Sequence, residues 1–157
     1  MARQRTLAFD SLDEAIQDAQ QLLHSGYDQH GAWDLSQCCG HLDRWLTFPM
    51  DGFPNPGFAM GAVLWMMKNT IAQSQLQKIL ADGFKPGTPT MPVSIPTKDE
   101  FEDATALSNL TATVQRFDAH AGTLHPSPLF GAIDKETLLN LQLKHFAHHL
   151  GFFSVKA

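Results

Sequence analysis

Apolar residues recur three and four positions apart in every long segment of this chain, and no segment shows sustained alternation of apolar and polar positions. The first spacing is the period of an α-helix that buries one face, whereas alternation would indicate a β-strand. Stretches rich in proline and glycine separate the periodic segments and mark breaks between helices. The pattern therefore predicts an all-α fold built from several amphipathic helices.

Three helix starts carry capping signals. Ser11 and Asp34 each offer a side-chain acceptor and are followed three residues later by Glu or Gln, which is the arrangement of a capping box. Helices are therefore expected over residues 11–26 and from residue 34 onward. Asp134 is expected to cap the last helix, which should extend to about residue 153.

The middle of the chain predicts two further helices with a proline-rich crossover between them. Residues 58–80 should form the third helix, and because its first half is apolar nearly all round, we expect it to lie in the centre of the fold. Residues 83–96 contain four prolines and should be irregular, anchored by Val93 and Ile95. Residues 97–119 should form the fourth helix. Together with the segments above, these predict a four-helix bundle with a long crossover and a short extra helix.

Composition limits the class of protein. The chain has 157 residues, of which 43% are hydrophobic and 17% charged, so it is expected to fold as one globular domain over residues 1–157. The tryptophans and methionines of the helical segments are expected to pack in its core. These are Trp33, Trp45, Trp65, Met60, Met66 and Met67.

A net charge of -5 and the lack of a Lys/Arg cluster argue against a nucleic-acid partner. The first residues lack the apolar stretch of a signal peptide, and the most apolar run, 58–67, is too short to cross a bilayer. A cytoplasmic protein without a membrane partner is therefore expected. Cys38 and Cys39 are neighbours in a predicted helix, where their side chains diverge, so we expect reduced thiols.

Three histidines predict a metal site. His145 and His149 lie one helical turn apart in the last helix, so their rings can reach one divalent ion. His41 lies among the apolar positions of the second helix and can supply a third ligand. Three protein ligands leave a position open for water or substrate, as in catalytic metal sites. An all-imidazole set suits Zn, Ni, Fe or Cu and does not by itself choose among them. Zn or Ni is the metal that we expect first.

Other residues compete for a place at this site. A pair of His145 and His148 is also geometrically possible, although His148 is expected nearer the surface, behind the ligands. Cys38 lies one turn before His41 and can line the same cavity, but a small buried hydrophobic residue is the favoured interpretation. Of the four remaining histidines, which fall at helix ends or in loops, His125 is the one most expected to face a pocket.

Two segments carry a family resemblance. Residues 34–42, Asp-Leu-Ser-Gln-Cys-Cys-Gly-His-Leu, follow a tryptophan and resemble the second helix of the DinB/YfiT-like metalloenzyme superfamily. Residues 125–131, His-Pro-Ser-Pro-Leu-Phe-Gly, lead into a helix that contains Lys-His-Phe-Ala-His-His-Leu at 144–150. This second pattern resembles one bacterial branch of the superfamily, a domain family of unknown function.

The resemblance implies a four-helix bundle with a long crossover and one metal ion. It implies one ligand on the second helix and two on the last, at positions that match His41, His145 and His149. Characterised relatives include transferases and isomerases that depend on a low-molecular-weight thiol, so a thiol partner is implied as one option.

Two hypotheses about function follow. The first is a metal-dependent enzyme acting on a small molecule, either a thiol-dependent transferase or a hydrolase, whose three-histidine site activates water or a thiolate. The second is a non-catalytic helical protein that binds a partner or forms a homodimer, in which the histidines are hydrogen-bonded core residues and no cavity reaches them.

Overall fold

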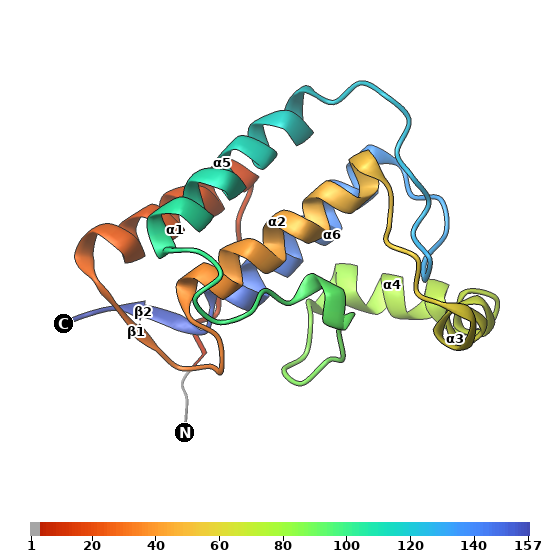
Figure 1. Ribbon diagram of the computed structural model, residues 1–157, viewed down its shortest axis with the longest axis horizontal. Coiled ribbons are helices and arrows are strands. Elements are labelled where there is room, and N and C mark those ends of the chain that lie inside the picture. Colours follow the sequence, from red (N-terminus) through yellow and green to blue (C-terminus); the bar gives the residue numbers. More distant parts are fainter. Residues whose placement is uncertain (1–3) are drawn as a thin grey trace.

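The computed structural model describes residues 4–157 and is mostly helical (Figure 1). Within these residues it has six α-helices, one short 3-10 helix and one two-stranded sheet. The helices are α1 (Leu12–Ser25), α2 (Leu35–Asp51), α3 (Phe58–Lys68), α4 (Ala72–Asp82), η1 (Pro92–Ser94), α5 (Asp103–Ala119) and α6 (Lys135–Leu150), and the strands are β1 (Tyr27–Gln29) and β2 (Phe153–Val155). An all-α fold class fits this content.

The four longest helices, α1, α2, α5 and α6, enclose the core. Helix α2 packs against α5 and α6, and α1 packs against the same two helices. In Figure 1 these four run along one diagonal of the view, while α3 and α4 lie to one side. The largest fully buried apolar side chains are Phe117, Phe146, Phe153, Leu12, Leu22, Leu35, Leu42, Leu46, Leu110 and Leu150.

The predicted N-caps Ser11, Asp34 and Asp134 are present, but the capping box predicted at Ser11 is not complete. The Ser11 hydroxyl accepts a hydrogen bond from the Glu14 N–H at 3.1 Å, while the Glu14 carboxylate accepts from the N–H of Asp10. Asp34 and Gln37 form a complete capping box at the start of α2. These bonds satisfy backbone donors that a helix cannot satisfy internally, so they fix where α1 and α2 begin.

A small sheet closes the end of the fold and shortens the last helix. Tyr27 pairs with Val155 and Gln29 with Phe153 in antiparallel register, joining the segment after α1 to the segment after α6. Helix α6 therefore ends at Leu150, three residues before the predicted end. Strands of three residues are too short to show alternation in a sequence, which is why the pattern did not indicate them.

The prediction of a single helix over residues 58–80 was wrong, because the structure has two helices there, α3 and α4. The segment is interrupted between α3 and α4, where the side chains of Asn69 and Thr70 bond back to the carbonyls of Trp65 and Met66 at 2.7 and 2.8 Å. Such bonds compete with the helical backbone ladder and favour an end to the helix.

The central position expected for the apolar part of this segment was also wrong. None of the residues of α3 is buried, and Trp65 is 66% exposed. The core packing expected for the tryptophans and methionines is therefore not found: Trp65, Met60 and Met66 are exposed, and Trp33, Trp45 and Met67 are only half-buried. A helix that is apolar nearly all round has no distinct apolar stripe. Its sequence therefore does not predict which of its faces packs against the rest of the protein.

The crossover is irregular, as its prolines predicted, and approaches α2 closely. Its buried residues are Ser94 and Pro96, whereas Val93, an expected anchor, is 54% exposed. A Cβ atom added to Gly40 of α2 would lie 2.7 Å from the Pro96 ring. Glycine at this position therefore lets the crossover lie against the helix.

Replacing Gly40 tests this close approach. Gly40→Ala should lower the free energy of unfolding by about 1–3 kcal/mol, because the Pro96 ring must move. Gly61→Ala in α3 is the control, since its Cβ would meet only a Pro56 carbon at 3.8 Å and alanine favours a helix. Urea denaturation of both variants measures the difference. Equal stability of the two would contradict this packing.

Candidate metal site

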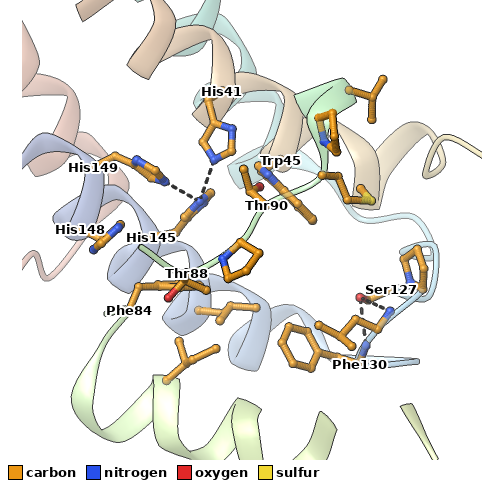
Figure 2. Close-up of a pocket in the computed structure, with 18 of the residues that line it drawn as sticks. His41, Trp45, Phe84, Thr88, Thr90, Ser127, Phe130, His145, His148 and His149 are labelled. Atoms are coloured by element: carbon orange, nitrogen blue, oxygen red, sulfur yellow. Dashed lines mark hydrogen bonds between the residues drawn. The ribbon is translucent and has the colours of Figure 1, made fainter. Parts of the chain in front are cut away.

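Three imidazoles meet between α2 and α6. His41 comes from α2, and His145 and His149 come from one face of α6, one turn apart. His145 Nε2 lies 3.2 Å from His41 Nε2 and 3.1 Å from His149 Nε2, and one nitrogen from each ring lies within 4.8 Å of the other two (Figure 2). The structure thus brings together the three histidines that the sequence singled out.

The crossover sets the orientation of His41. Its Nδ1 lies 3.0 Å from the backbone carbonyl of Ser94, which can only accept a hydrogen bond. Nδ1 therefore carries the proton when the ring is neutral, and Nε2 presents a lone pair to the other two histidines. A hydrogen bond of this kind from the distal ring nitrogen is the usual support of a metal-ligating histidine.

The two short contacts of His145 cannot both be straight hydrogen bonds between neutral rings. His41 Nε2 is an acceptor, so its contact requires a proton on His145 Nε2. That proton cannot also lie along the line to His149 Nε2 at 3.1 Å. A divalent cation between the three nitrogens satisfies all the lone pairs at once.

Two of the three separations, both from His145 Nε2, fit such an ion, and the third is within 4.8 Å. A tetrahedral zinc ion with Zn–N bonds of about 2.0–2.1 Å places its ligand nitrogens about 3.3–3.4 Å apart. The observed 3.1 and 3.2 Å are close to this value. The residues present can therefore hold a metal ion, and the chemistry of the donors fits Zn, Ni, Fe or Cu.

Burial keeps the three rings neutral. Desolvation lowers the pKa of His41 from 6.5 to about 4 and lowers the pKa values of His145 and His149 well below the usual range. His41 is fully buried and His145 is 8% exposed. At neutral pH each ring therefore has a free lone pair, which is the form that binds a metal.

Aromatic rings surround the imidazoles. Trp33 stacks on His149 with centroids 5.2 Å apart and also contacts His41 at 4.8 Å. Phe84, from the start of the crossover, lies 5.2 Å from the His145 ring. These rings limit the access of water to the nitrogens, which strengthens electrostatic interactions there.

A cavity of about 940 Å³ reaches the three histidines. It is lined by α2 and α6, by α3, by the crossover and by the turn of residues 127–130. Figure 2 shows the histidines at one end of this space and Ser127 and Phe130 at the other. The histidine cluster is therefore accessible to a small molecule, unlike a closed structural site.

The other residues expected near the site lie at different positions relative to the three histidines. His148 lines the cavity and is half-buried, but it is not one of the three converging rings, as expected. Cys38 is buried, also lines the cavity, and has a thiol whose pKa burial raises well above its usual value. His125, the loop histidine most expected to face a pocket, is exposed and does not line this cavity, and its backbone N–H donates to the Pro49 carbonyl.

Sequence reasoning missed several residues of the site. Ser94 and Phe84 contact the cluster, and neither carries a local signal for that role. The turn of residues 127–130 belongs to a segment that carries the family resemblance, but that resemblance did not place it at the cavity. The length of the crossover was a general indication, since long loops in compact domains are often functional.

A family model described as "Protein of unknown function (DUF1569)" matches residues 1–156. The chain belongs to this family. No curated protein and no solved structure matches it. The predicted membership of a domain family of unknown function is thereby confirmed. Within residues 4–157, no helix is both long and apolar enough to cross a membrane.

The neutral state of His41 predicts a pH dependence for the metal-free protein. Its folded pKa of about 4 lies below the ordinary 6.5, so the unfolded chain binds more protons in between. The contribution of the His41 ring to the free energy of unfolding is therefore fully present above about pH 6.5 and is lost as the pH falls toward 4. Between pH 7 and pH 5 this loss is about 2 kcal/mol.

Urea denaturation at both pH values measures this loss. In His41→Gln, the loss of unfolding free energy between pH 7 and pH 5 should be smaller by about 2 kcal/mol. In His125→Gln, at an exposed position, the loss should equal that of the wild type. An unchanged pH dependence in His41→Gln would show that this ring does not carry the effect.

Proposed function

We propose that this protein is a metal-dependent enzyme of the DinB/YfiT-like type, with a four-helix bundle that holds one divalent ion on His41, His145 and His149. Zn and Ni are the first candidates, and Fe and Cu are alternatives. The observation that carries the proposal is the convergence of three neutral imidazole nitrogens where a large cavity ends. We place the enzyme in the cytoplasm.

A bound ion would act as a Lewis acid and lower the pKa of a coordinated water or thiol. The chain itself supplies orientation and a dry environment. The Ser94 carbonyl holds the His41 ring in place, and Trp33 and Phe84 cover the cluster. We assign a reaction on a small molecule in the cavity, either hydrolysis or transfer from a low-molecular-weight thiol.

His148 is the residue best placed to move a proton in this reaction. Its ring centroid lies 4.9 Å from that of His149, and it lines the cavity without belonging to the three converging rings. Burial lowers the pKa of His148, so the ring is neutral at pH 7 and can accept a proton.

One observation favours the second hypothesis, a partner-binding or dimeric protein. Helix α3 carries exposed apolar side chains, including Phe58 at 96% and Trp65 at 66% exposure. However, that hypothesis expected no cavity at the histidines, and a cavity reaches them. We therefore retain the second hypothesis only for the outer face of α3.

This hypothesis predicts that the protein forms a homodimer through α3 and that Phe58→Ser weakens the dimer, as measured by sedimentation velocity. A wild-type protein that is monomeric at all concentrations would contradict the homodimer.

Metal analysis tests the proposed site. Purified protein dialysed against zinc should contain about one ion per chain. His145→Ala should contain much less zinc, because only two imidazoles remain to hold the ion. His125→Ala is the matched control, since this exposed ring lies outside the cavity, and it should retain the ion. A wild-type metal content near zero after soaking with Zn or Ni, or equal content in His145→Ala, would contradict the proposal.

A further inference from the structure

The walls of the cavity carry no charge. Among the described residues that line it, none has a carboxylate, an ammonium or a guanidinium group. Apart from the histidines and Cys38, its side chains are apolar, aromatic or neutral and polar. A charged group on a ligand would lose its water here without gaining an ionic partner, which costs several kcal/mol in a largely apolar environment.

Most neutral polar side chains of the wall are already hydrogen-bonded to the chain. Thr88 Oγ1 donates to a carbonyl of its own turn at 2.6 Å. Ser127 Oγ accepts from two backbone N–H groups at 3.2 and 3.1 Å. Gln142 Nε2 donates to the carbonyl of Trp45 at 3.3 Å, whereas Gln142 Oε1 and Trp45 Nε1 are buried without a hydrogen-bond partner among the described residues. Away from the histidines, the cavity therefore offers mainly apolar surface to a ligand.

The two ends of the cavity differ in chemistry. The histidines, with their free lone pairs, occupy one end, and the turn that carries Ser127 and Phe130 lies at the other (Figure 2). Its volume of about 940 Å³ is near the upper end of the range for small-molecule sites, about 300–1,000 Å³. The space suits a molecule with one polar end and a long apolar body.

Helix α3 forms an adaptable wall of this space. Met60, Val63, Leu64 and Met67 line the cavity, although none of the residues of α3 is buried. Methionine side chains are flexible and accommodate different apolar shapes. Because moving α3 exposes little buried surface, this helix can shift to admit a ligand.

On the basis of the metal site proposed above, we propose that the substrate is an uncharged, largely apolar small molecule whose single polar end lies against His41, His145 and His149. The same walls disfavour co-substrates that carry carboxylates along their length. If the reaction is a transfer from a low-molecular-weight thiol, that thiol should therefore carry no carboxylate or other charged group.

Titration calorimetry with matched probes tests this inference. Zinc-loaded protein should bind octanohydroxamic acid at least about tenfold more tightly than the analogue that carries a carboxylate at the far end of the chain. Equal or tighter binding of the carboxylate analogue would overturn the proposed substrate class.

A third probe separates this proposal from the metal site. Octanamide has the same apolar chain without the chelating group. If octanamide binds as tightly as the hydroxamic acid and the protein holds no zinc, the metal proposal fails while the apolar-ligand proposal stands. If neither neutral probe binds in the presence of zinc, the apolar-ligand proposal fails.

Two variants of α3 locate the binding. Leu64→Asp puts a charge on the cavity wall and should weaken octanohydroxamic acid at least about tenfold. Met66→Asp makes the same change two residues along, at a position 55% exposed and outside the cavity lining, and should leave the affinity unchanged. Circular dichroism checks that both variants fold. Equal effects of the two substitutions would contradict binding under α3.

Discussion

The hydrogen bond between His41 and the Ser94 carbonyl links three parts of the molecule. It fixes the ring of a fully buried histidine, it anchors the proline-rich crossover on α2, and it determines which nitrogen faces α6. The bond depends in turn on Gly40, because a side chain there would hold Pro96 away from the helix. The position of the candidate metal site thus depends on the path of a loop as much as on the helices.

The three neutral imidazoles, of which His41 and His145 are buried and His149 is half-buried, are enclosed by the surrounding structure. Aromatic rings cover the cluster from two sides, with Trp33 against His149 and Phe84 against His145. The cavity then continues away from the cluster between α6, the crossover and α3. The apolar composition of α3 is consistent with this role, because one side of the helix forms a wall of the cavity rather than part of the core.

Local signals in the sequence predicted the four longest helices and the residues of the cluster. The caps at Ser11 and Asp34 and the one-turn spacing of His145 and His149 are set by backbone geometry, which nearby residues determine. Even the inward direction of His41 followed from its place among apolar positions.

Apart from the break between α3 and α4, which local side-chain bonds favour, the predictions that failed depend on contacts between distant segments. The β1–β2 pairing joins the two halves of the chain, and the exposed position of α3 reflects how its neighbours pack. Likewise, Ser94 approaches His41 across 53 positions of the chain, which no local pattern indicates.

Anomalous diffraction at the zinc edge, from crystals of the zinc-loaded protein, would show whether three imidazole nitrogens share one metal ion. We expect a single strong peak at about 2.0–2.1 Å from the Nε2 atoms of His41, His145 and His149. A loaded protein with no peak at this point, or with zinc bound only to other side chains, would contradict this expectation.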